Sequence, residues 1–140
     1  LSSSVRGEAR EAALTHVAVA EEMGATGNPV ETPAVVLSGG EATATVRGDG
    51  VGGPNADFAL AAAVELPPGA TLACVDTDGR DGSSDYAGAL VDADTVDDVG
   101  AARRALANSD AFGYLGGRDA VVSTGPTGTN VNDLRVLVVE

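Results

Sequence analysis

The sequence predicts an α/β layered domain in which helices flank a mixed central β-sheet. The 140 residues suffice for one hydrophobic core. A composition of 44% hydrophobic and 21% charged residues is typical of a globular protein. Strand-like segments alternate with helix-like segments, which indicates α/β layering. Adjacent strand-like segments between residues 34 and 47 favour a mixed sheet over a purely parallel one.

The first expected element is an amphipathic helix over residues 6–23. Apolar residues recur there every three to four positions, at Ala9, Ala13, Val17 and Ala20. Gly24 is suited to end this helix. After a loop of turn-forming residues, the pattern predicts a buried strand over residues 34–38 and an alternating strand over residues 42–47.

A glycine-dense loop, RGDGVGGPN, leads into a second helix expected over residues 54–66. Pro54 lies in its first turn, where proline is favoured. The second half of the chain continues the alternation, and Asp94 is expected to cap the third helix. Strands are expected at residues 71–76, 87–91, 120–123 and 134–139, and helices at residues 95–107 and 110–115.

The charge balance excludes several classes of partner. Eight basic residues, all arginine, face 21 acidic ones, so the net charge is −13. Such a surface repels phosphate backbones and anionic lipid, which argues against nucleic-acid and membrane binding. The lone Cys74 excludes an internal disulfide framework. The absence of lysine and the excess of acidic residues suggest a salt-adapted (halophilic) cytoplasmic protein. The chain has no initiator methionine, and Leu1 is expected to be an internal residue of a longer polypeptide.

Three polar, glycine-rich loops are the candidates for chemistry, because ligands of open α/β sheets bind where loops leave the strands. Residues 38–41 (SGGE) form either a hairpin turn, which is the favoured interpretation, or an anion-binding turn. In residues 77–85, Asp78 and Asp81 could hold Mg²⁺ or could be turn formers and solvated charge. Residues 124–133 (TGPTGTNVND) form either a plain long loop or, as their density of hydroxyls, amides and glycines favours, a site for phosphate or carboxylate oxygens.

His16 and Cys74 are weaker candidates for a functional site. His16 is expected to be a surface histidine on a helix flank, and Cys74 an inert core residue. The chain has no Walker A loop, no convincing dinucleotide fingerprint and no recognisable nucleophilic triad.

Four segments carry a resemblance to a known family: LSGGEATATVRGDG, GGPNADFALAAAVEL, DTDGRDGSSDYAGALVD and STGPTGTNVNDLRVLVV. They resemble the C-terminal (MOFRL) domain of the glycerate 2-kinase family, whose members were once widely named hydroxypyruvate reductases. The resemblance covers essentially the whole chain, without the family's larger N-terminal Rossmann-like domain. It implies phosphorylation of D-glycerate to 2-phosphoglycerate with ATP and Mg²⁺ in a cleft between the two domains. The isolated domain is therefore expected to be inactive.

The resemblance also implies roles for individual residues. Catalytic roles fall on Asp78, Asp81 and Glu41, and Asp78 and Asp81 are expected either to bind Mg²⁺ or to orient the substrate hydroxyl. Substrate or phosphate contacts fall on Ser38, Gly39, Gly40, Asn55, Thr124, Gly125, Thr127, Gly128, Thr129, Asn130 and Asp133.

The chain departs from the family pattern at an arginine that would bind the transferred phosphate. The family usually reads GGRNQEF where this chain reads GGPNADF, so that Pro54 replaces an expected arginine. Arg47 or Arg80 could substitute, the missing domain could supply the charge, or the substrate or activity could have changed. Alternative functions are an oxidoreductase acting on hydroxypyruvate and a non-catalytic small-molecule-binding module. Homo-oligomerisation stays open.

Overall fold

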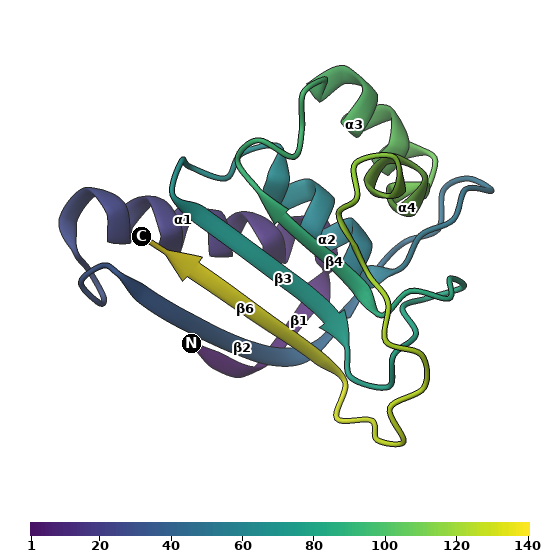
Figure 1. The fold of residues 1–140 in the computed structure, drawn as a ribbon, viewed down its shortest axis with the longest axis horizontal. Coiled ribbons are helices and arrows are strands. Elements are labelled where there is room, and N and C mark those ends of the chain that lie inside the picture. Colours follow the sequence, from purple (N-terminus) through teal and green to yellow (C-terminus); the bar gives the residue numbers. More distant parts are fainter.

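A computed structural model describes all 140 residues, which form a six-stranded sheet with helices on one face (Figure 1). The strand order is β1-β2-β6-β3-β4-β5. The strands are β1 (Ser2–Glu8), β2 (Ala34–Thr43), β3 (Ala70–Asp76), β4 (Gly88–Asp92), β5 (Val121–Val122) and β6 (Asp133–Val139). The helices are α1 (Ala9–Thr26), α2 (Pro54–Ala63), α3 (Val99–Ala107) and α4 (Ala111–Gly116).

The sheet is mixed, which confirms the predicted fold class. Strands β1 and β2 are parallel, whereas each of the other neighbouring pairs is antiparallel. In this topology β2 and β3 end, and β6 begins, at the same end of the sheet. The loops after β2, after β3 and before β6 therefore meet there.

The hydrophobic core lies between the sheet and helices α1 and α2. Helix α2 is buried from Asn55 to Ala63, because α1, α3 and α4 pack around it on the sheet. Cys74 is fully buried in β3, as predicted, and burial raises the pKa of its thiol. No helix combines the length and apolar character that crossing a bilayer requires. The other face of the sheet carries no helix (Figure 1).

The N-terminal region differs from the prediction. Residues 2–8 form strand β1, so helix α1 begins at Ala9 rather than at residue 6. Strand β1 lacks an apolar pattern and exists because it pairs with β2, more than 30 residues away. The helix also passes Gly24 and ends at Gly27, whose left-handed backbone (φ 75°) donates its N–H to the carbonyl of Met23.

The Gly39-Gly40 pair does not form a hairpin, so that prediction is wrong. Strand β2 runs without interruption through both glycines, and residues 44–47 are not a strand. Gly40 has φ 134°, and a Cβ there would lie 2.2 Å from the carbonyl oxygen of Val5. A glycine is required here because the backbone of β1 at Val5 lies too close for a side chain at position 40.

Helix α3 begins later than predicted. Asp98, not Asp94, caps it, and its side chain accepts a hydrogen bond of 2.9 Å from the N–H of Ala101. The N–H of Asp94 instead donates to the carboxylate of Asp92 in a turn. The sequence favoured Asp94 because both aspartates precede helix-compatible residues, and the fold selects the later one.

Candidate functional site

Two of the three polar loops are joined to each other by hydrogen bonds. The hydroxyl of Thr77 donates to the carbonyl of Asn132 at 2.8 Å and accepts from the N–H of Val131 at 2.8 Å. The amide of Asn130 donates to the Asp78 carboxylate at 3.3 Å, and the N–H of Thr127 donates to the Asp78 carbonyl at 3.2 Å. The loop after β3 and the loop before β6 therefore form one double loop.

The double loop places several predicted contacts together at the surface. Asp78 and Gly125 line a hollow of ≈ 210 Å³ with Arg80 and Asp85. The predicted contacts around it are largely exposed: Thr124, Thr127, Gly128, Thr129 and Asn130. Glu41 is exposed at the end of β2.

Asp81 is fully buried, whereas Asp78 is half-buried. The Asp81 side chain accepts hydrogen bonds from the N–H groups of Asn55 (3.0 Å) and Ala56 (2.8 Å), and from the Asn55 amide (3.2 Å). These bonds satisfy the first free N–H groups of helix α2. Burial raises the pKa of Asp81 to about 6, although the same hydrogen bonds oppose the rise.

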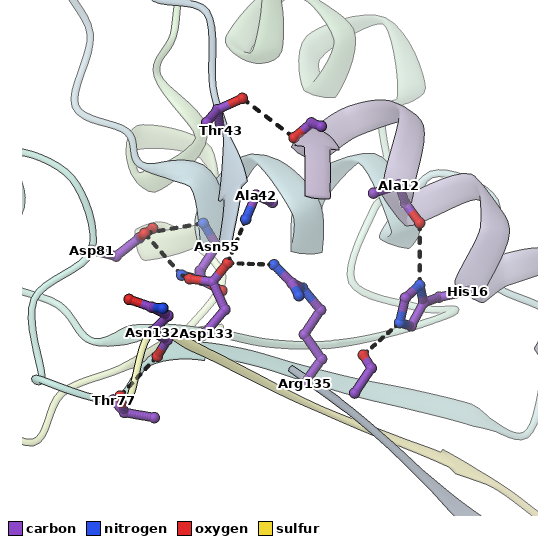
Figure 2. A network of polar contacts seen from close by, with 12 residues as sticks. Ala12, His16, Ala42, Thr43, Asn55, Thr77, Asp81, Asn132, Asp133 and Arg135 are labelled. Atoms are coloured by element: carbon purple, nitrogen blue, oxygen red, sulfur yellow. Dashed lines mark hydrogen bonds and ion pairs between the residues drawn. The ribbon is translucent and has the colours of Figure 1, made fainter. Parts of the chain in front are cut away.

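Asp133 is the centre of a buried polar network (Figure 2). One carboxylate oxygen accepts from the N–H of Ala42 (2.8 Å) and from the guanidinium of Arg135 (2.6 Å), and the other accepts from the Asn55 amide (2.9 Å). Arg135 is fully buried and lies over the Phe58 ring, 4.4 Å from its centroid. Asp133 and Asn55 thus connect β2, α2 and β6, and neither side chain reaches the surface.

Ser38 contacts His16, which corrects the prediction of a surface histidine. His16 is 2% exposed, and its Nε2 lies 2.7 Å from the Ser38 hydroxyl (Figure 2). Its Nδ1 lies 3.1 Å from the carbonyl of Ala12, which can only accept, so Nδ1 carries the proton and Nε2 accepts from Ser38. Burial lowers the pKa of His16. His16 lies on the buried face of helix α1, which packs against the sheet, and it is the one polar residue on that face. The sequence alone did not show that this face includes His16.

A cavity of ≈ 270 Å³ lies beside the N-terminus of α2. Pro54, Asp57 and Ser109 line it, together with glycines of two loops and Ser83. Four of the lining residues have backbone N–H groups that donate no hydrogen bond within the chain: Gly52, Gly53, Gly82 and Ser83. Unpaired backbone amides in a glycine-rich segment can bind the oxygens of a small anion.

Asp57 provides the one carboxylate of this cavity. Its side chain is 3% exposed, and Oδ2 accepts from Nε (3.1 Å) and Nη2 (2.9 Å) of Arg10. The other oxygen, Oδ1, accepts no hydrogen bond and lies 3.6 Å from where a Cβ on Gly52 would be. Burial raises the pKa of Asp57, while Arg10 opposes the rise. Oδ1 is therefore available to a ligand.

Mg²⁺ fits the residues here only in part. No group of three or more His, Cys, Asp or Glu side chains is placed to hold a metal ion. Asp81 does not fit as a ligand, because both of its oxygens are buried and bonded to α2. Asp78 fits better, since it is only half-buried and lies next to Asp76, whose pKa is raised by burial and by the Asp78 carboxylate. Two carboxylates suit Mg²⁺ that also keeps waters or phosphate oxygens.

Sequence reasoning missed the cavity residues. Asp57 and Arg10 are 47 residues apart, and no local pattern joins them. The signal that could have found the cavity is the glycine-dense segment before Pro54, whose spacing fits no dinucleotide fingerprint.

The chain is similar to known proteins in sequence and structure. The MOFRL family matches residues 34–133. The D-glycerate 2-kinase of Thermotoga maritima is 39% identical, over 96% of this chain and 34% of that protein. The glycerate 2-kinase of Pyrococcus horikoshii is 36% identical, over 99% of this chain and 33% of that protein. The crystal structure of glycerate kinase from Thermotoga maritima matches with a TM-score of 0.96 at 37% identity, covering 100% of this chain and 35% of that one.

The chain thus spans about a third of the length of these relatives. The family match extends over more than half of the sequence, and the fold agrees over the full chain. This chain belongs to the MOFRL family.

Proposed function

We propose that this chain supplies the substrate-binding part of a glycerate 2-kinase, which transfers the terminal phosphoryl group of ATP to the 2-hydroxyl of D-glycerate with Mg²⁺. The supporting observation is the cavity beside α2, which is lined by residues with unpaired backbone amides, by two serines and by one carboxylate. The names of the relatives support glycerate as substrate. Because the chain spans a third of their length, the nucleotide site is proposed to lie on another domain, preceding this one, and residues 1–140 alone are proposed to be inactive.

The cavity is suited to a small hydroxy acid. The N–H groups of Gly52, Gly53 and Gly82 would bind the carboxylate or transferred phosphoryl oxygens, as backbone amides do in anion sites. Their fixed positions require no reorganisation during the reaction, which is the main contribution that a protein makes to phosphoryl transfer.

Asp57 would orient the substrate hydroxyl. As the hydroxyl oxygen bonds to the terminal phosphorus, the bond from phosphorus to the ADP oxygen breaks and the hydroxyl proton must leave. Oδ1 of Asp57 is free to accept that proton, while Arg10 fixes Oδ2. Burial raises the pKa of Asp57, which makes it a better base near neutral pH.

The double loop would bind Mg²⁺ and the phosphate groups of the nucleotide. Asp78 and Asp76 would hold Mg²⁺, which when bound offsets the charge of phosphate oxygens. The further contacts proposed are Glu41, Thr124, Gly125, Thr127, Gly128, Thr129 and Asn130. Ser38, Gly39, Gly40, Asn55, Asp81 and Asp133 are proposed to act by positioning β2, α2 and β6, because they are buried or paired within the fold.

We propose that Arg47 takes the role of the phosphate-binding arginine that the family has at the position of Pro54. Its N–H donates to the Ser109 hydroxyl at 2.8 Å, and Ser109, Pro54 and Val46 all line the cavity. The positive charge of Arg47 also acts on Asp57. Arg80 instead donates to the carbonyl of Ser84 and lines the smaller hollow.

The test is made on the intact polypeptide that contains residues 1–140. ATP and D-glycerate are supplied, ADP release is followed, and ³¹P NMR identifies the phosphorylated position. Asp57→Asn is expected to lower kcat at least roughly 100-fold, as loss of a positioned base does. Glu65→Gln, exposed beyond the other end of α2, is the control and should leave kcat unchanged.

Three further variants test the loops. Arg47→Ala should raise KM, while Asp78→Asn and Thr129→Val should lower kcat. Unchanged turnover in Asp57→Asn and Asp78→Asn would contradict the proposal. Glycerate binding without ADP formation would indicate a binding module, and NADH oxidation with hydroxypyruvate would indicate a reductase.

A further inference from the structure

The uncovered face of the sheet is apolar across four strands. We define the open face as Val35, Leu37, Ala73, Val75, Leu90, Leu134, Val136 and Val138. The pairing register places Leu37 opposite Val136, Val136 opposite Ala73, and Ala73 opposite Leu90. Directly paired residues share a face of the sheet, so these side chains form a continuous row.

The open face combines large apolar side chains with high exposure. Val35 is 60% exposed, Leu37 55%, Leu90 49% and Leu134 40%. The register also places Thr71 and the exposed Asp92 on this face, next to Val138, so the apolar residues are bordered by a carboxylate at that end. A contiguous exposed apolar patch of this kind marks an interaction surface.

The first residue lies at the margin of the open face. The backbone nitrogen of Leu1 lies 2.6 Å from the carbonyl oxygen of Leu37. Leu1, Ser2 and Ser3 line a hollow of ≈ 460 Å³ together with Leu37, Gly39 and Leu134. Figure 1 shows the N-terminus beside β2. Any polypeptide joined before Leu1 therefore starts beside this surface.

We propose that a part of the same polypeptide preceding residue 1 packs on the open face. The relatives are about three times as long as this chain, so polypeptide of sufficient size is expected. A second copy is the alternative occupant, and it would have to be recruited from solution. A covalently joined segment is instead held at high effective concentration.

The open face also adjoins the loop end of the sheet. Leu134 follows Asp133, and Val75 precedes Asp76, so the last row of the face borders the polar loops. A segment packed there would also lie next to the double loop. The inference rests on this surface and on the length of the relatives, and it holds whether or not the chain takes part in phosphoryl transfer.

Thiol labelling of the intact polypeptide containing residues 1–140 tests the inference. Leu90→Cys and Leu37→Cys probe the open face, and Val30→Cys, 51% exposed in the loop between α1 and β2, is the matched control. Native Cys74 is 0% exposed and should not react. With a maleimide under native conditions, both face cysteines should react at least roughly tenfold more slowly than the control, since labelling requires local opening. The ratio should not change on dilution.

Three results would overturn the proposal. The face cysteines could react as fast as Val30→Cys, which would show that the face is free. Protection could disappear on dilution, which would show that a second copy covers it. The intact polypeptide could have a mass of 13.7 kDa, which would leave no further segment. None of these readouts depends on kinase activity.

Discussion

Replacing Asp81 with Asn tests how the carboxylate below helix α2 contributes to stability. The side chain accepts three hydrogen bonds, two at Oδ1 from Asn55 and one at Oδ2 from the N–H of Ala56. Asn has nearly the same shape, but its NH₂ group would face a donor. If the asparagine oxygen takes the place of Oδ1, its NH₂ group takes the place of Oδ2 and cannot accept from the N–H of Ala56. That N–H is then left unpaired, which costs about 1–3 kcal/mol.

The pH dependence of this cost follows from the pKa of Asp81. Burial raises it from the ordinary 3.8 to about 6. Between these values the folded protein binds the proton more tightly than the unfolded chain, so stability falls as the pH rises through this window. Over the whole range between these two pKa values, the free energy of unfolding changes by about 3 kcal/mol. From about pH 5 to about pH 8 the wild type should therefore lose roughly 1–2 kcal/mol relative to Asp81→Asn, which cannot titrate.

Urea unfolding at several pH values, followed by circular dichroism, measures both effects. Asp85→Asn is the control, because the Asp85 side chain lies in the same loop but is 99% exposed. It should show the wild-type pH slope. If the wild type instead gains stability over Asp81→Asn as the pH rises, the carboxylate is held ionised and the burial argument is refuted.

His16→Asn should reduce the loss of stability on acidification. Because burial lowers the pKa of His16 below 6.5, its contribution is present above that pH and is lost as the pH falls; equal slopes in urea unfolding would contradict this. Gly40→Ala should cost more than about 2 kcal/mol, since its Cβ would overlap the backbone of β1 at positive φ. In calorimetry Gly116→Ala, which meets nothing within 4 Å, should leave Tm nearly unchanged. Asp57→Asn should cost about 3 kcal/mol by leaving the largely buried Arg10 charge without its carboxylate, and adding Arg10→Met should recover part of that loss; a loss below about 1 kcal/mol would argue against the ion pair.

Local pattern predicted most elements of the fold. Helix α2 begins at Pro54 as expected, and β3, β4 and β6 lie within one residue of their predicted bounds. These elements are readable because their burial has a period that the sequence itself shows. The polar, glycine-rich loops were predicted as residues 77–85 and 124–133, next to apolar strands, and the double loop lies within them; Asp81 and Asp133 of these segments are buried instead.

The sequence by itself determined which segments are helices or strands and which loops are polar, because these depend on near neighbours in the chain. Only the tertiary structure decided that β1 joins β2, that Asp81 turns under α2, and that Asp57 meets Arg10 beside a cavity. Each of these depends on which strands and helices become neighbours in space. That choice is made by burial of the whole core and by hydrogen bonds between residues 25 to 47 positions apart, which no local pattern encodes.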